Sequence, residues 1–167
     1  PLTGGSHGAG LWTGIYITNK GHAVLNDVTL DNAKTAVKVE GQLSANKLTI
    51  NDAYIGINVI GSADIESLTA QHIDYEVLRN SGNLNLSSGT FSDVAGGLWS
   101  TGMSTVDTVT ISQAGTGLRS TSGTLSATGI GFINTSVAIA SQHGASTTVQ
   151  SITANNVPLL IHYAARH

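Results

Sequence analysis

The sequence predicts an all-β protein, a right-handed parallel β-helix (β-solenoid) of about eight coils, with about 21 residues and three short strands in each coil. Apolar and polar residues alternate with period two, which indicates strands, and an aliphatic residue recurs every 20 to 22 positions. A second motif of the form apolar–Thr–apolar recurs upstream of it. The recurring aliphatic residues are Ile15, Val37, Ile57, Val77, Leu98, Leu118, Ile139 and Ile161.

Each coil is expected to contain three strands in a fixed order. The apolar–Thr–apolar motif is the second strand, and in residues 28–30 the side chain of Thr29 is expected to point outward. The third strand carries the aliphatic column, with Val37 and Val39 inside and Lys38 outside. The first strand of each coil is expected around Val24, Leu43, Ile65, Leu84 and Leu125. The outward threonines, interrupted at Gly131, are Thr29, Thr49, Thr69, Thr90, Thr110 and Thr153.

Polar turn residues separate these strands. Residues 26–27, 31–32 and Gly41 occupy the corners of one coil, and their Asn, Asp and Gly side chains tolerate the backbone of tight corners. One coil cannot bury its apolar face alone, so coils stack in parallel at about 4.8 Å, with the right-handed sense of the crossover rule. Helical repeats are excluded, because they need longer units and 3.6-residue periodicity. We expect one domain over 1–167, with 1–10 as a Gly-rich extended N-terminal segment.

The composition restricts the partners of the chain. Charged residues make up 10% of it and the net charge is -3, whereas nucleic acids and anionic membranes select clustered Lys and Arg. Neither is therefore expected as a partner, and no apolar run approaches the ~20 residues that span a bilayer. The absence of cysteine excludes disulfides and thiolate metal sites. The surface rich in Ser, Thr and Asn is typical of extracellular solenoids, and the first residue, Pro1, indicates a processed piece.

Two groups of segments carry a resemblance to known families. The segment GLWTGIYITNKGHAVLNDVTLDNAKTAVKV (10–39) resembles the repeats of pectin-lyase-like β-helix proteins. That resemblance implies a superfamily of polysaccharide lyases and hydrolases, phage tailspikes and secreted surface proteins. The segments QLSANKLTI (42–50) and GTLSATGIGF (123–132) are similar to repeats of haemagglutinin-type adhesins. The resemblance implies the fold, and it does not select one activity, because one solenoid hosts many.

One column of turn residues brings titratable side chains together. Asp52, His72 and Asp93 are expected to stack about 4.8 Å apart, a trio that could bind a cation or exchange protons. The alternative is a polar turn ladder, because the neighbours in the column are amides. No Lys or Arg is placed to act as a base, so no catalytic residues are expected. The six histidines show no HxH or HExxH spacing, so neither a transition-metal site nor a cofactor is expected.

An outward column of the third strand is the best candidate for a binding face. Its functional members are expected to be Tyr16, Trp99, Arg119 and His162. Exposed aromatic side chains beside Arg suit stacking on sugar rings or packing against another chain, although a loop or a subunit could also cover them. The other members of the column are expected to be Lys38, Asn58, Leu78 and Ala140. A second charged group, Asp74, Glu76 and Arg79, is expected to be a solvated surface cluster.

These observations leave several functions open. The first is an extracellular structural or adhesive module that self-assembles, end to end as a filament or surface layer or else laterally, or that presents a glycan-binding face. Residues 159–163 form an apolar edge on the last coil that favours end-to-end association. The alternative is a fragment of a polysaccharide-degrading or phage tailspike enzyme. Ice binding is a third possibility, because the Thr column resembles that of ice-binding solenoids but lacks their second Thr column.

Overall fold

The structure is a computed structural model that describes residues 12–164. These residues form one 12-stranded sheet in which every strand pairing is parallel, and they contain no helix. The expected extended segment 1–10 lies outside the described residues. The strands are β1 (Thr13–Ile17), β2 (His22–Leu25), β3 (Val28–Val39), β4 (Gln42–Val59), β5 (Ser62–Asn80), β6 (Asn83–Leu86), β7 (Gly89–Ser100), β8 (Met103–Ser120), β9 (Gly123–Gln142), β10 (Ala145–Gln150), β11 (Thr153–Asn155) and β12 (Leu159–Ala164).

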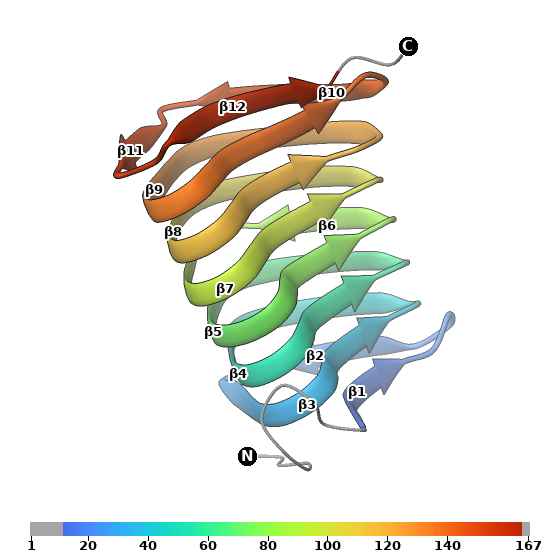
Figure 1. The fold of residues 1–167 in the computed structure, drawn as a ribbon. Coiled ribbons are helices and arrows are strands. Elements are labelled where there is room, and N and C mark those ends of the chain that lie inside the picture. The colour runs from blue at the N-terminus through green and yellow to red at the C-terminus, as the bar shows by residue number, and fades with distance from the viewer. Residues whose placement is uncertain (1–11, 165–167) are drawn as a thin grey trace.

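The sheet is wound into a β-solenoid, as the sequence predicts. The chain completes about seven turns of about 21 residues, rather than eight, because the eight predicted column positions enclose seven intervals. In Figure 1 the near strands run from left to right and the far strands return, while the chain climbs from the N-terminal to the C-terminal end. This path is a right-handed coil, the sense that the crossover rule favours.

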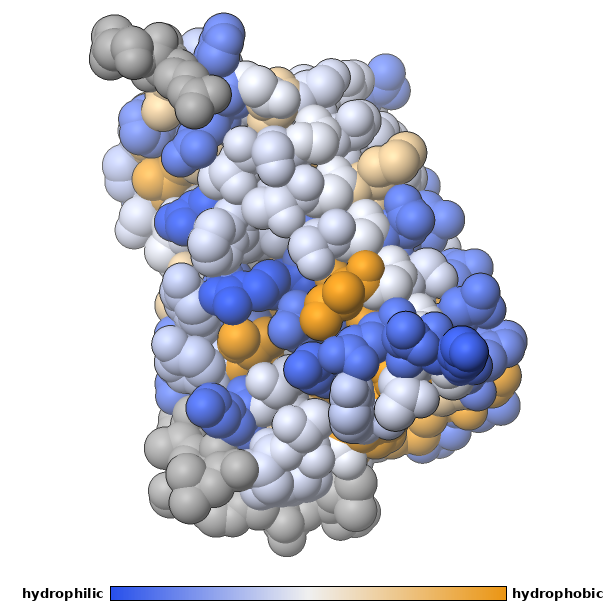
Figure 2. Space-filling model, turned by 90° about the vertical axis from the view of Figure 1, so that its right-hand side faces the viewer, coloured by the Kyte–Doolittle hydropathy of each residue, from blue (hydrophilic) through white to orange (hydrophobic). Residues whose placement is uncertain are grey.

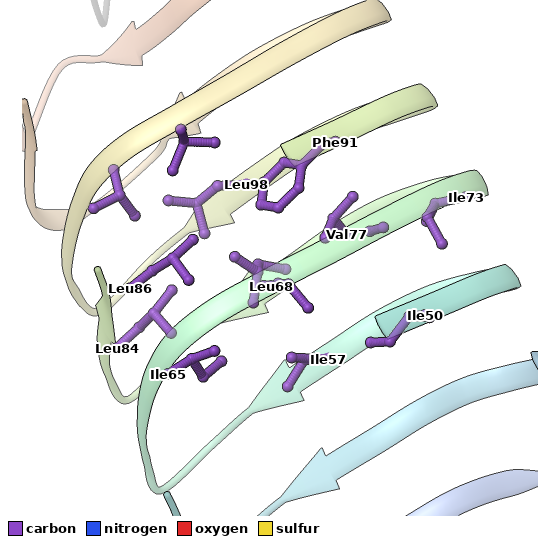
Figure 3. Close-up of a cluster of buried hydrophobic side chains, with 14 of the residues drawn as sticks. Ile50, Ile57, Ile65, Leu68, Ile73, Val77, Leu84, Leu86, Phe91 and Leu98 are labelled. Carbon is purple, nitrogen blue, oxygen red and sulfur yellow. The ribbon is translucent and has the colours of Figure 1, made fainter. Parts of the chain in front are cut away.

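The core is a single stack of inward side chains. Figure 3 shows Ile57 from β4, Leu68 from β5 and Phe91 from β7 pointing into one interior, and all three are almost completely buried. Burial of this kind contributes about 1.5–3 kcal/mol for each large aliphatic or aromatic side chain. Val24, by contrast, was expected near the first inward strand, but it is 63% exposed because its neighbours in β2 take the inward positions.

A one-residue bulge in β5 changes the predicted register. Between the paired positions Ala53 and Ile55, strand β4 has one residue, whereas β5 has two between Ile73 and Glu76. Every later residue of β5 is therefore displaced by one, so that Ile57 pairs with Leu78 and not with Val77. The prediction that Val77 belongs to the aliphatic column is wrong, although its side chain is still completely buried.

A second inward column of the third strand lies two residues after the aliphatic column, and its side chains change from apolar to polar along the solenoid. Its first three members, Ile17, Val39 and Val59, are aliphatic and buried. From β5 onward the same column is polar, and its members there are Asn80, Ser100, Ser120 and Ser141. The first three of these polar side chains are as buried as the valines.

The outer surface is mainly polar where the chain passes from one coil to the next. Figure 2 shows this side of the solenoid as hydrophilic or neutral, with only small and separate apolar patches. Corners of this kind require small residues, because the coils approach closely. At Gly61 a Cβ atom would lie 2.1 Å from the carbonyl oxygen of Gly41 in the preceding coil, a distance that real Cβ atoms do not reach.

Candidate functional site

The bulge in β5 produces the geometry of the candidate binding site. Because β5 contains one residue more than its neighbours at residues 74–75, the alternation of side chains is broken there. Tyr75 stays exposed and Glu76, which follows it, is buried. Bulges re-aim side chains in this way and are enriched near functional sites. The rings of Tyr75 and Tyr54, one coil earlier, lie 5.3 Å apart.

Beside the bulge, one aromatic ring lies between two guanidinium groups. Arg79, Trp99 and Arg119 occupy the same outward position in three successive coils. The guanidinium carbons of Arg79 and Arg119 lie 5.0 Å and 5.5 Å from the centroid of the Trp99 ring, and Arg79 also lies 4.9 Å from the ring of Tyr75. The indole N–H of Trp99 donates a hydrogen bond of 3.0 Å to Thr121 Oγ1. These contacts hold the arginines and the ring in one stack.

Glu76 is a buried carboxyl group beneath this stack. Only 5% of the residue is exposed, so the expectation of a solvated cluster is wrong for Glu76. Its Oε1 accepts hydrogen bonds of 3.4 Å and 3.3 Å from Nε and Nη2 of Arg79, whereas its Oε2 is buried without a partner. Burial raises the pKa of Glu76, and the positive charges of Arg79 and Arg119 offset part of that rise.

These side chains surround a cavity of about 170 Å³. The combination is unusual on this weakly charged surface: two aromatic rings, a guanidinium group and a buried carboxyl group meet within three coils. The cavity is lined by Tyr75, Glu76, Ala95, Gly96, Leu98, Trp99, Thr116 and Arg119. We call these residues, together with Arg79, the Arg–Trp site. It can bind a ligand that presents both apolar surface and hydrogen-bonding groups.

The structure places the predicted binding residues in one column but does not bring all of them together. Trp99 and Arg119 are adjacent, whereas Tyr16 belongs to β1 and His162 to β12, several coils away. Tyr16 donates a hydrogen bond to Glu40, which raises the pKa of its hydroxyl. Leu78 was expected in this column, but it is completely buried, and the bulge puts Arg79 in its place. The sequence prediction grouped Glu76 and Arg79 with Asp74 in a surface cluster, and it did not place Arg79 in the binding column or Glu76 at the cavity.

The predicted turn column forms one corner of the solenoid. His72 Nδ1 and Asp93 Oδ2 lie 2.6 Å apart on adjacent coils, and Asp52 occupies the same corner one coil earlier. Among the residues that the structure describes, no group of three or more His, Cys, Asp or Glu side chains is arranged to hold a metal ion. All members of the column have a positive φ, between 49° and 59°: Asn32, Asp52, His72, Asp93, Gln113, Asn134 and Asn156. The whole column therefore has a common structural role at the corner.

The threonine column also occupies the predicted register. Thr29 to Thr110 pair in consecutive coils, and Gly131 interrupts the column before Thr153. The neighbouring outward column contains Asp31, Asn51 and Ile133 rather than threonines. A role for this ladder beyond strand formation, such as ice binding, stays a prediction.

Comparison with known proteins does not assign the chain to a family. No protein-family model and no curated protein matches the sequence. Within the described part of the chain there is no helix with the length and apolar character to cross a membrane.

Proposed function

We propose that this chain is an extracellular structural module that binds glycan through the Arg–Trp site. The observation that carries the proposal is the cavity, in which a buried carboxyl group, a guanidinium group and aromatic rings meet. Sugars present hydroxyl groups that both donate and accept hydrogen bonds, together with apolar C–H faces. The carboxyl of Glu76 accepts hydrogen bonds, the guanidinium of Arg119 donates them, and Tyr75 and Trp99 supply apolar surface.

The role of Trp99 differs from simple ring stacking on a sugar. The guanidinium groups of Arg79 and Arg119, from the coils on either side, lie over the indole ring, so we do not expect a free ring face for stacking on a sugar. Trp99 thereby fixes the direction of Arg119, which lines the cavity. We therefore expect the loss of Trp99 to weaken glycan binding through the arginines it supports as well as through lost contact area.

Binding to a panel of neutral and charged polysaccharides tests this proposal. Trp99→Ala and Arg119→Gln should each weaken binding at least tenfold, while circular dichroism stays unchanged. Lys38→Gln is the matched control, because it removes one positive charge from the same column but outside the cavity. Unchanged binding in both site variants would refute the proposal. Release of reducing ends or unsaturated products from the panel would favour the enzyme alternative, above all if Asp52→Asn or Asp93→Asn abolished it.

A second function, end-to-end association with another copy of the chain or with the rest of a longer one, is supported by β12. Ile161 continues the aliphatic column in which Ile57 is completely buried, yet Ile161 is 54% exposed. Leu159, Leu160 and Tyr163 of the same strand are 41%, 44% and 57% exposed. Exposed core positions on an open strand edge favour pairing with another strand. Light scattering should show a mass that rises with concentration and falls in Ile161→Lys, and a monomer at every concentration would contradict this function.

A further inference from the structure

We propose that the cavity of the Arg–Trp site is a subsite for one anionic sugar unit, with Arg119 on its anionic substituent and Glu76 on a neighbouring hydroxyl group. This inference rests on the glycan-binding function proposed above and specifies its ligand. The anionic substituent is a carboxylate or a sulfate, both of which accept hydrogen bonds from a guanidinium group.

The unpartnered oxygen of Glu76 indicates a hydrogen-bond donor in the ligand. Buried polar atoms in folded proteins almost always have a partner, and leaving one without a partner destabilises the protein. Glu76 Oε2 has none, although Oε1 is held by Arg79. Glu76 also lines the cavity. Oε2 is itself shielded from solvent in the free protein, so a ligand hydroxyl reaches it when the Glu76 side chain turns toward the cavity, and it then supplies a hydrogen bond that the free protein lacks.

Arg119 supplies the attraction for an anion. Arg79 is ion-paired with Glu76 at 3.3 Å, whereas Arg119 has no ion pair within the described part of the chain and is exposed. Its guanidinium carbon lies 5.5 Å from the centroid of the Trp99 ring, and Arg119 lines the cavity. Two guanidinium groups beside one carboxyl group also disfavour a cationic ligand. The site therefore combines an anion-binding group and a hydroxyl acceptor.

The size of the cavity limits what enters it. Its volume of about 170 Å³ is below the ~300–1,000 Å³ of pockets that enclose whole drug-sized ligands. One sugar unit is therefore the largest part of a glycan that the cavity takes. Specificity is expected to come from that unit, because a site built to pair a hydroxyl group discriminates strongly against ligands that lack it.

Four polymers separate the elements of this inference. Alginate carries carboxylates and hydroxyls, a sulfated galactan carries sulfates and hydroxyls, polyacrylate carries carboxylates without hydroxyls, and dextran carries hydroxyls without charges. The wild-type chain should bind alginate or the sulfated galactan at least tenfold more tightly than the other two. Which of the two anionic glycans is preferred identifies the substituent.

Two variants and one control assign the interactions. Glu76→Met keeps the length of the side chain and removes its oxygens, so it should weaken binding of the preferred glycan about tenfold to a hundredfold without weakening binding of polyacrylate. Arg119→Gln, at an exposed position where the substitution does not endanger folding, should weaken binding of the anionic glycans and leave binding of dextran unchanged. Asp74→Asn removes the same charge as Glu76→Met from an exposed residue nearby, and it should bind like the wild type.

The outcomes distinguish the two levels of the proposal. If no glycan binds, the proposed function fails and the subsite fails with it. If dextran binds as tightly as the anionic glycans, or if Glu76→Met and Arg119→Gln both bind the preferred glycan normally, the subsite is refuted while the glycan-binding function stands. Should Glu76→Met fail to fold, Arg119→Gln and the polymer comparison in the wild-type chain still decide the question.

Discussion

The two halves of the solenoid fill the same inward column with opposite chemistry. In the N-terminal half the column consists of Ile17, Val39 and Val59, and in the C-terminal half it begins with Asn80 and Ser100. The strands run in the same direction in both halves and the column members pair with one another from coil to coil, and Val59, Asn80 and Ser100 are all completely buried. A buried column of a solenoid therefore need not be apolar.

The polar half is possible because its first members have partners. The amide of Asn80 donates hydrogen bonds of 2.8 Å to Ser104 Oγ and to the carbonyl oxygen of Met103, and its oxygen accepts one of 2.9 Å from the N–H of Gly82. Ser100 Oγ lies 2.7 Å from Ser104 Oγ. Buried polar groups cost little when they are fully hydrogen-bonded and much when they are not. The comparison thus predicts that stability depends on the partners and not on the polarity of the column.

The change from apolar to polar occurs in the coil that carries the bulge. Strand β5 contains the extra residue, the buried Glu76 and the first polar member of the column, Asn80. The irregular backbone, the buried carboxyl group and the start of the polar column therefore lie in one coil, next to the cavity of the Arg–Trp site. Departures from the repeat of this kind are expected where a protein carries function.

The largest effect should follow from placing a polar side chain in the apolar half. Val39→Asn buries an amide where both neighbours in the column, Ile17 and Val59, are aliphatic, so we expect a loss of about 3–5 kcal/mol in the free energy of unfolding. Val39→Ala, which only removes packing, should cost about 2 kcal/mol. Denaturant unfolding measures both. Equal losses in the two variants would show that the apolar half accepts polar residues as readily as the C-terminal half.

The next largest effect concerns the hydrogen bonds of the polar half. Asn80→Ala removes the partner of the Gly82 N–H, the Met103 carbonyl and the Ser104 hydroxyl, so we expect a loss of about 2–3 kcal/mol. Asn85→Ala, at an exposed position of β6, is the matched control and should change stability by less than about 0.5 kcal/mol. If Asn80→Ala is as mild as its control, the hydrogen bonds of Asn80 do not support the column.

The sequence was sufficient to predict the architecture because the repeat is regular. The apolar–Thr–apolar motif and the aliphatic column each recur at nearly constant spacing, so Thr29, Thr49 and Thr69 were placed in their correct pairing. Corner positions were also predictable, because Asn, Asp and Gly mark the places where the backbone turns. Residues such as Asn32 indeed have a positive φ.

The site could be predicted only in part, because a one-residue bulge leaves almost no mark on the spacing. Coils of 20 and 21 residues both occur, and the position of the extra residue within β5 depends on packing. The sequence prediction puts the extra residue after Val77, whereas in the structure it lies before Glu76. The prediction therefore assigns Leu78, and not Arg79, to the outward column. The same error left Glu76 outside the core. The polar inward column was missed for a related reason, since polar residues such as Ser100 in a period-two pattern predict an outward side chain.

A smaller effect is expected from the titration of Glu76. Its pKa is raised above the ordinary value of 4.5, mainly by burial, so the folded chain binds the proton more tightly than the unfolded chain. The contribution of Glu76 to stability is fully present below about pH 4.5 and is lost as the pH rises through the folded pKa. Glu76→Gln does not titrate, so its stability relative to the wild type should increase from pH 4 to pH 7. A parallel pH profile of Glu76→Gln and the wild type would contradict the assignment.

The smallest effect gives the sharpest test of the comparison, because one substitution should have opposite signs in two adjacent coils. Ser100 and Ser120 pair in the same column and both are completely buried, but only Ser100 has a hydrogen-bond partner, since Ser120 Oγ has none. Ser100→Ala should therefore lower the free energy of unfolding by about 1 kcal/mol. Ser120→Ala removes an unsatisfied hydroxyl from the core, so it should leave stability unchanged or raise it by up to about 1 kcal/mol. Thermal and denaturant unfolding of the two variants measure the difference, and equal losses would mean that the polar column is hydrogen-bonded as far as Ser120.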